Sequence, residues 1–182
     1  MILASQSPRR RELLSLITED FRIIPAKGEE NLPENISPRE AVLLLSRQKA
    51  TEIYSEYKNE TIIAADTVVA AEGKILGKPA DEKDAADMLR LLSGTRHSVF
   101  TGVCVISEDG AINNFAEETV VEFYPLTEEE IAAYVATGEP MDKAGAYGIQ
   151  DRGAILVKSI IGDYYNVMGL PVGRLYRELK TV

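Results

Sequence analysis

The chain has 182 residues, of which 45% are hydrophobic and 27% are charged, and its formal net charge is −9. This composition is typical of a soluble globular protein that can bury one good core, and the acidic balance argues against nonspecific binding along a nucleic acid. No apolar run is long enough to span a bilayer, and the single cysteine, Cys104, excludes an internal disulfide. With no signal-peptide pattern, we expect a cytoplasmic protein.

Strand-like and helix-like segments alternate along the chain, which is typical of an α/β protein. We expect strands over residues 1–4, 21–25, 61–71, 97–107, 112–123 and 153–161. We expect helices over residues 8–17, 38–57, 81–92, 127–136 and 167–180. The turn signal Ser107-Glu108-Asp109-Gly110 predicts an antiparallel hairpin, so the sheet should be mixed. Because no linker or repeat divides the chain, we expect a single domain over residues 1–182, with room for two lobes.

The start of the first expected helix is suited to binding a phosphate group. Ser7 fits the N-cap and Pro8 the first helical position. The first turn offers free backbone N–H groups and the positive end of the helix dipole, and Arg9 and Arg10 add two cationic side chains there. A solvated basic turn explains this segment about equally well.

An acidic pair, Glu29-Glu30, follows the second expected strand. Two neighbouring carboxylates can hold a divalent cation, although a solvated acidic loop is the commoner explanation. Lys49 lies late in the helix expected over 38–57, where a cation also interacts favourably with the helix dipole. By itself, this lysine indicates no site.

Asp66 stands inside the apolar run Ile62–Val69, which is predicted to be a strand. A carboxylate in such a run is costly to bury unless it is paired, protonated or bound to a metal. We therefore favour a role in metal binding or general-base catalysis over an aspartate that caps a turn or lies exposed at a bulge.

Three features further along the chain have both a functional and an ordinary explanation. Lys78, in Gly77-Lys78-Pro79, can reach a phosphate from the end of a hairpin or can be a plain turn lysine. His97 is the only histidine, so a His/Cys zinc site is excluded and a structural hydrogen bond is expected. In the glycine-rich stretch Glu139–Gln150, the amide of Gln150 can recognise an amide or imide edge, although a loop between elements is the alternative.

Taken together, these segments resemble the Maf family of nucleoside triphosphate pyrophosphatases. The matching pieces follow the family order over nearly the whole chain: Ala4–Arg10, Lys49-Ala50, Ala65–Val68, Gly77–Pro79, His97–Val99, Asp142–Gln150 and Gly169–Pro171. The resemblance implies a mixed, curved sheet flanked by helices in two lobes around a cleft, as in the inosine triphosphatase (Ham1) group. It also implies hydrolysis between the α- and β-phosphates, with Mg²⁺ or Mn²⁺ as the divalent metal.

The resemblance also assigns roles to single residues. Asp66 matches the catalytic carboxylate that accepts a proton, and Glu30 matches a second acid that helps to hold the metal, with Glu29 as the alternative. The positions that match phosphate contacts are Ser7, Arg10, Lys49 and Lys78, and we count the two lysines with the catalytic residues. The positions that differ between family branches with different substrates are Arg9, Thr67 and Gln150. The residue types at these positions resemble those of the dTTP/UTP branch. Two departures from relatives are Asp151, where glycine is common, and Lys27-Gly28 ahead of the acidic pair.

The expected function is therefore metal-dependent hydrolysis of dTTP and UTP, and of modified pyrimidine nucleotides, to the monophosphate and pyrophosphate. The alternative is a nucleotide-binding regulator of cell division without turnover, because the family is named after septum formation. The expected partner is a nucleoside triphosphate, not a nucleic acid or a membrane, and the sequence leaves a homodimer open.

Overall fold

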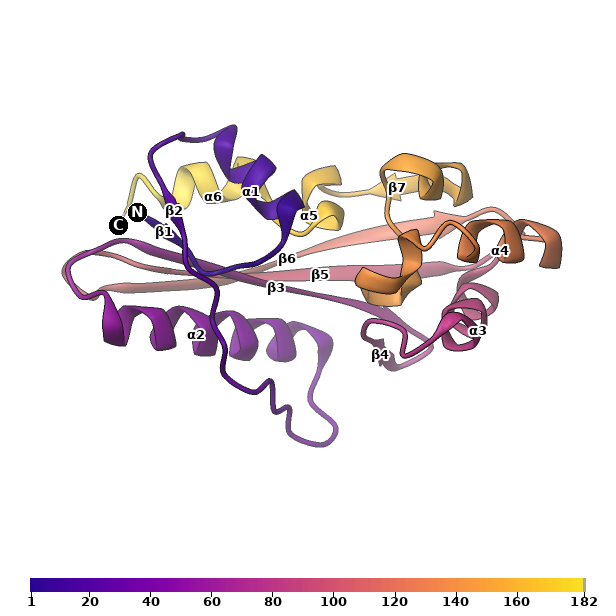
Figure 1. Ribbon diagram of the computed structural model, residues 1–182, viewed down its shortest axis with the longest axis horizontal. Helices are drawn as coiled ribbons and strands as arrows, with labels where there is room; N and C mark the ends of the chain where they lie inside the picture. Colours follow the sequence, from indigo (N-terminus) through magenta and orange to yellow (C-terminus); the bar gives the residue numbers. More distant parts are fainter. Residues whose placement is uncertain (182) are drawn as a thin grey trace. The chain divides into compact units, whose positions relative to one another are not determined.

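The computed structural model of the chain describes residues 1–181 and has a mixed α/β fold (Figure 1). The strands are β1 (Ile2–Leu3), β2 (Arg22–Ile23), β3 (Ile62–Ala71), β4 (Lys74–Leu76), β5 (Arg96–Ile106), β6 (Ile112–Phe123) and β7 (Val157–Ile161). The α-helices are α1 (Pro8–Ser15), α2 (Pro38–Glu56), α3 (Glu82–Leu92), α4 (Glu128–Val135), α5 (Tyr164–Met168) and α6 (Val172–Glu178). Three 3-10 helices, η1 (Glu139–Asp142), η2 (Ala144–Ala146) and η3 (Asp151–Leu156), complete the elements within residues 1–181.

The strands of this part of the chain form one mixed sheet in the order β2-β1-β3-β5-β6-β7, with β4 paired to β3. Strand β1 is parallel to β2 and β3, whereas β4 is antiparallel to β3 and β7 is antiparallel to β6. The expected hairpin is confirmed, because Ser107 N donates to Ala111 O at 2.9 Å and Phe123 N donates to Thr95 O at 3.1 Å. The expectation of a mixed sheet is therefore correct.

The expected helix over 167–180 is wrong as a single element. The chain forms α5 and α6 instead, separated by Gly169-Leu170-Pro171. Gly169 has a φ of 108°, which a residue with a side chain rarely adopts, and Pro171 has no N–H to continue a helix. The strand expected over 153–161 is also shorter, because residues up to Leu156 belong to η3.

The chain folds into two compact units. Unit 1 consists of Met1–Thr67, Thr101–Glu117 and the residues from Gly169 onward, and unit 2 consists of Val68–Phe100 and Glu118–Met168. Strands β3, β5 and β6 each contribute residues to both units. The expectation of a single domain stays a prediction.

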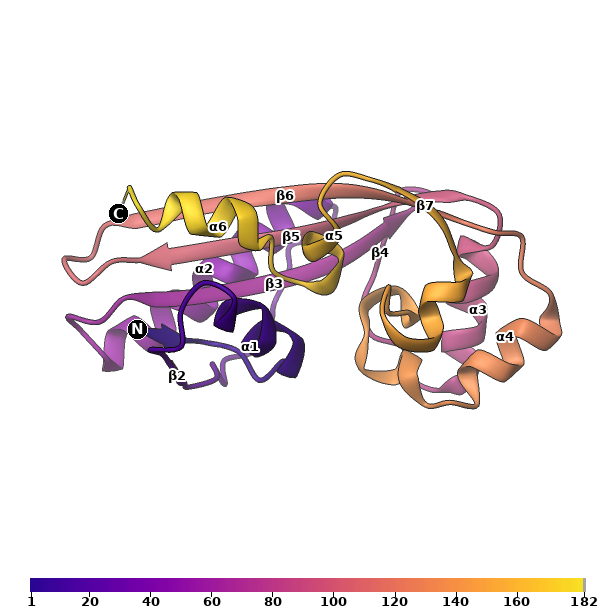
Figure 2. The ribbon, with the colours of Figure 1, turned by 90° about the horizontal axis from the view of Figure 1, so that it is seen from above.

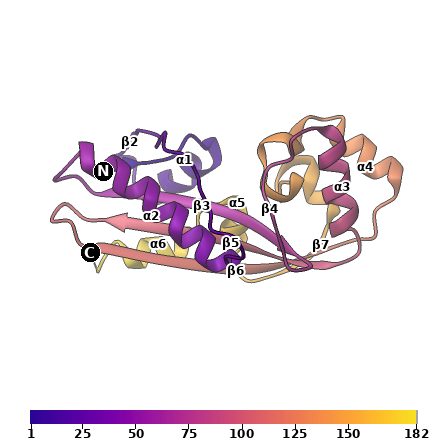
Figure 3. The ribbon, with the colours of Figure 1, turned by 90° about the horizontal axis from the view of Figure 1, so that it is seen from below.

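In unit 1, helices cover both faces of the strands. Helix α2 lies along one face, and α1 and α6 lie on the other (Figures 1, 2 and 3). Ala50 and Ile53 of α2 pack in one buried cluster with Ile2, Ile62 and Cys104 of the strands. Burial raises the pKa of the Cys104 thiol to about 11, so this cysteine is a core residue, as expected from its apolar surroundings.

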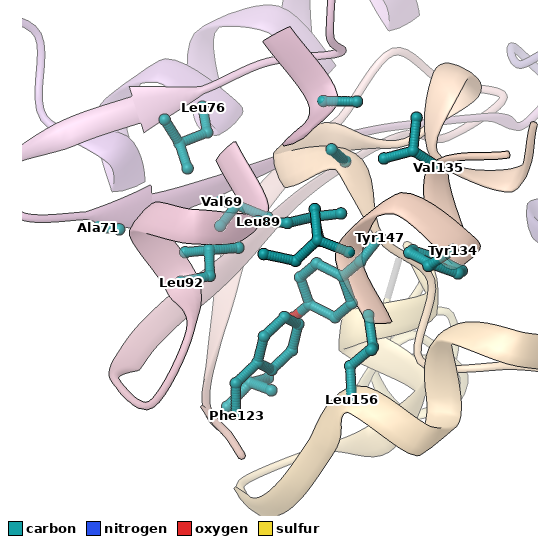
Figure 4. Packing of buried hydrophobic residues seen from close by; sticks show 14 of the residues in the cluster. Val69, Ala71, Leu76, Leu89, Leu92, Phe123, Tyr134, Val135, Tyr147 and Leu156 are labelled. Carbon is teal, nitrogen blue, oxygen red and sulfur yellow. The ribbon is translucent and has the colours of Figure 1, made fainter. Parts of the chain in front are cut away.

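Unit 2 has its own hydrophobic core. Helix α3 contributes Leu89 and Leu92 to this core, and Phe123 and Tyr147 point toward each other beside Leu156 (Figure 4). The rings of Phe123 and Tyr147 are edge to face, with centroids 4.7 Å apart. Within residues 1–181, no helix combines the length and the apolar character that crossing a membrane requires.

His97 lies in this core with an exposed fraction of 3%. Its Nε2 is 2.8 Å from the hydroxyl of Tyr147, whereas its Nδ1 is buried without a hydrogen-bond partner in the described part of the chain. The expected structural hydrogen bond is thus present. Burial lowers the pKa of His97 from 6.5 to about 4, because the imidazolium would lose its hydration there.

This histidine should make the protein less stable as the pH falls from about 6.5 to 4. In that window the unfolded chain binds a proton at His97 and the folded chain does not, so the free energy of unfolding falls with the pH. We expect the wild type to lose about 2–3 kcal/mol more than His97→Gln between pH 7 and pH 4.5. Urea unfolding at both pH values measures the difference, and parallel losses in the two proteins would contradict it.

Candidate active site

Helix α1 begins as the sequence predicts, at a capped N-terminus. Ser7 has extended backbone angles, its hydroxyl accepts a hydrogen bond from Arg10 N at 3.4 Å, and Pro8 occupies the first turn. The hydroxyl of Ser5 accepts from Ser7 N at 3.2 Å, which fixes the approach to the helix. This helix start therefore combines the positive end of a helix dipole with the side chains of Arg9 and Arg10.

The Arg10 guanidinium is held by three neutral acceptors of unit 1, two of them distant in the sequence. Its Nε donates to Gly169 O and its Nη2 donates to the Thr67 hydroxyl, both at 2.9 Å. Its Nη1 donates to the Ser5 hydroxyl at 3.5 Å. Because these acceptors carry no charge, they orient the guanidinium without cancelling its positive charge.

Burial is the main cause that lowers the pKa of Arg10, and the positive charge of Arg9 lowers it further. The negative charges of Asp66 and Glu30 act in the opposite direction. An arginine stays protonated under such an influence, since its ordinary pKa exceeds 12. Arg10 is thus an oriented cation close enough to two carboxylates to feel their field.

Lys49 joins those two carboxylates. Its Nζ lies 2.6 Å from Asp66 Oδ1 and 2.7 Å from Glu30 Oε1. The three groups come from α2, β3 and the loop after β2, so the tertiary fold of unit 1 assembles them. The Asp66 side chain is 11% exposed and the Glu30 side chain is 55% exposed. The buried aspartate is therefore paired, as its apolar strand requires.

The structure distinguishes the two acids that the sequence left open. Glu30 contacts Lys49, whereas Glu29 Oε2 accepts a hydrogen bond from Asn31 Nδ2 at 3.5 Å. Both oxygens on Lys49 lie within hydrogen-bonding distance of one nitrogen and are therefore close to each other. Glu30 is the better placed partner for Asp66.

The two carboxylates of this site suit a divalent cation that also binds the substrate. Within residues 1–181, no three His, Cys, Asp or Glu side chains are grouped as metal ligands, so a cage made only of protein side chains is absent there. Mg²⁺ commonly uses one or two carboxylates together with waters and substrate phosphates. Asp66 and Glu30 supply such a pair of carboxylates.

Sequence analysis missed Thr101 and Gly169 as parts of this site. Thr101 is fully buried in β5, and its hydroxyl lies 3.0 Å from the hydroxyl of Thr67. A carbon side chain built on Gly169 would come within 3.4 Å of both Arg10 and Thr67. The local signal for Thr101 is a polar residue in an apolar strand. For Gly169 it is the turn-rich segment Tyr164–Pro171, which ends in Gly-Leu-Pro.

Lys78 and Gln150 belong to unit 2. Lys78 is exposed just after β4, and Gln150 precedes η3. The peptide of Gly145 donates from its N to Gly77 O at 3.0 Å, which ties the Lys78 turn to the glycine-rich stretch. The Tyr134 hydroxyl also accepts from Gly148 N at 3.1 Å. Both residues thus lie in loops that are held by hydrogen bonds from backbone N–H groups.

Asp151 has a backbone conformation that glycine also adopts readily. Its φ of 53° is in the left-handed region, where glycine is favoured and aspartate is tolerated. We expect Asp151→Val to lower the free energy of unfolding by about 1–2 kcal/mol, and Asp151→Gly to change it by less than about 0.5 kcal/mol. Thermal or urea unfolding tests this, with Arg152→Val as the control for an exposed valine on ordinary backbone. Equal stability of the Asp151 and Arg152 valine variants would refute the strain argument.

Comparison with known proteins gives consistent matches over the whole chain. The family model described as "Maf-like protein" matches residues 1–182. A protein named dTTP/UTP pyrophosphatase from Geobacillus sp. (strain WCH70) is 53% identical over 182 residues, covering 100% of this chain and 97% of that protein. Another protein of that name, from Carboxydothermus hydrogenoformans, is 54% identical over 179 residues, covering 98% of this chain and 96% of that protein.

A solved structure shares the fold at low sequence identity. The HAM1 protein from Coxiella burnetii has a TM-score of 0.52 and 16% identity, and the match covers 100% of this chain and 98% of that chain. The expected Ham1-like α/β fold is therefore confirmed.

Proposed function

Because the chain belongs to the Maf-like protein family, we propose that it is a nucleotide pyrophosphatase that hydrolyses dTTP and UTP to the monophosphate and pyrophosphate. The observation that carries this proposal is the Lys49 ammonium held between the Asp66 and Glu30 carboxylates, with the oriented Arg10 guanidinium in their field. A triphosphate needs several cations and a metal to balance its charge. This group of side chains supplies two cations, Lys49 and Arg10, and two carboxylates that can hold a metal.

Asp66 is the proposed general base. Its carboxylate can orient a water molecule toward the α-phosphorus and accept the proton that the water loses. Lys49, whose Nζ lies 2.6 Å from this carboxylate, holds it in place. Glu30 is the second acid of the pair, and Asp66 and Glu30 would together hold the divalent cation.

The cations of the site are proposed to bind the phosphates. Arg10 and the N–H groups at the start of α1 can donate to phosphate oxygens, and Lys49 can stabilise the charge that develops as the anhydride breaks. Lys78 is proposed to add a further cation. A bound Mg²⁺ or Mn²⁺ supplies Lewis-acid polarisation of the phosphoryl oxygens.

Base selection is proposed to rest on Arg9, Thr67 and Gln150. A uracil or thymine edge offers two carbonyl oxygens and one N–H, and an amide side chain carries a donor and an acceptor that complement it. Modified pyrimidines that keep this edge should also be accepted.

Product analysis tests the proposal. Purified protein is incubated with dTTP, UTP, CTP, ATP, GTP and 7-methyl-GTP, each with Mg²⁺, with Mn²⁺ and with EDTA. We expect equal amounts of monophosphate and pyrophosphate from dTTP and UTP, little from the others, and none with EDTA. If the folded protein bound dTTP but hydrolysed no nucleotide under any of these conditions, the proposed enzymatic function would be wrong. A nucleotide-binding regulator would then be the better assignment.

A further inference from the structure

The loop that carries Glu30 is anchored to α2 at a second point. Glu52 lies one turn after Lys49 on this helix, and its two carboxylate oxygens bind two consecutive peptide groups of the loop. Oε1 accepts from Lys27 N at 2.7 Å and Oε2 accepts from Gly28 N at 3.0 Å. Hydrogen bonds from peptide N–H groups to an ionised carboxylate are stronger than those between neutral groups.

Gly28 makes this close approach possible. A carbon side chain built on Gly28 would lie 2.8 Å from Glu52 Oε2, closer than such contacts occur. A larger residue at position 28 would therefore require the Glu52 carboxylate to shift from this place. The Lys27-Gly28 segment thus has a defined partner in Glu52.

Little else in the loop fixes the position of Glu30. Residues 26–36 contain no helix or strand, and the Glu30 side chain is largely exposed, so few packing contacts restrict it. Its carboxylate nevertheless reaches Lys49 on the same helix that carries Glu52. Two residues of α2 therefore hold the loop. Glu52 binds its backbone, and Lys49 binds the Glu30 carboxylate.

We propose that Glu52 is a positioning residue, which fixes the Lys27-Gly28 peptides so that the Glu30 carboxylate stands beside Asp66 and Lys49. The enzymatic part of this inference rests on the proposed function, because Glu30 has a metal ion to hold only if a metal–nucleotide complex binds there. The anchoring itself does not depend on it.

Amide hydrogen exchange tests the anchoring directly, without substrate or metal. In Glu52→Ala, the amides of Lys27 and Gly28 should exchange at least about 10-fold faster than in the wild type, since both lose their acceptor. The amide of Ala4, which donates to Ile63 O in the sheet, serves as the internal standard for an intact fold. Glu56→Ala removes the same charge from the same helix and should leave all three rates unchanged.

Metal titration of dTTP hydrolysis tests the consequence. We expect Glu52→Ala to raise the Mg²⁺ concentration for half-maximal rate about 10-fold and to change kcat at saturating Mg²⁺ by less than about 3-fold, as for other residues that orient a metal ligand. Gly28→Ala should shift the metal dependence in the same direction, and Glu52→Gln, which keeps one acceptor oxygen, should fall between. Adding Glu52→Ala to Glu30→Gln should have no further effect, because the acid to be positioned is already gone.

Each outcome decides one part of the inference. Unchanged exchange at Lys27 and Gly28 in Glu52→Ala would overturn the anchoring. Faster exchange with an unchanged metal dependence would show that the anchored loop does not position Glu30, which also overturns the proposal. Failure of the wild type to hydrolyse any nucleotide would refute the proposed function, while the exchange data would still decide whether Glu52 holds the loop.

Discussion

Replacing Asp66 by asparagine should reduce kcat for dTTP by about 100- to 10,000-fold, the range that a general base contributes. Asparagine keeps the shape of the side chain and an oxygen for Lys49, but it accepts no proton and carries no charge. Pyrophosphate release measures the loss, and urea unfolding shows whether the variant is folded.

Asp20→Asn is the matched control for this change. Asp20 is an exposed aspartate of the same unit, and its replacement should leave kcat within about 2-fold of the wild type, as expected for a surface change away from the site. A folded Asp66→Asn protein that kept more than a tenth of the wild-type kcat would exclude Asp66 as the base.

Replacing Arg10 by alanine should damage both stability and activity. The guanidinium donates to Gly169 O and to the Thr67 hydroxyl, so its loss removes a hydrogen bond from each of these partly buried acceptors, although Thr67 keeps the Thr101 hydroxyl as a partner. We expect the free energy of unfolding to fall by about 2–4 kcal/mol and kcat/KM for dTTP to fall at least about 100-fold. Urea unfolding and steady-state kinetics provide the two readouts.

Arg10→Lys separates charge from geometry. Lysine keeps the positive charge but lacks the planar fork that reaches both acceptors, so activity should stay well below that of the wild type. Arg11→Ala removes the next, exposed arginine of α1 and should affect neither readout strongly. Equal losses in the Arg10 and Arg11 alanine variants would mean that the basic segment acts only through its overall charge.

Local signals were sufficient to predict most of the fold. Ser7 caps α1 as its side chain predicts, because a cap depends on residues only two or three positions away. The side chains of Ser37, Asp81 and Thr127 cap α2, α3 and α4 in the same local way. The hairpin turn at Ser107–Gly110 is local in the same sense. The break between α5 and α6 was missed because apolar residues continue at helical spacing across Gly169-Leu170-Pro171, although the glycine and the proline interrupt the backbone.

The chemistry of the site was only partly predictable. The residue types at Ser7, Arg10 and Asp66 indicate phosphate and proton chemistry from their immediate neighbours. Their partners could not be inferred in this way, since the Gly169 carbonyl lies 159 positions from Arg10 in the chain. The choice between Glu29 and Glu30 likewise depends on how a loop without regular structure folds back onto α2, and only the tertiary structure gives this.

Hydrolysis of dTTP in ¹⁸O-labelled water tests the central claim most directly, because it shows which phosphorus the water attacks. If Asp66 directs water to the α-phosphorus, the products are dTMP carrying one ¹⁸O atom and pyrophosphate without label. Mass spectrometry of both products after a single turnover distinguishes the alternatives. Label in the pyrophosphate, or the formation of dTDP and inorganic phosphate, would contradict the proposed reaction.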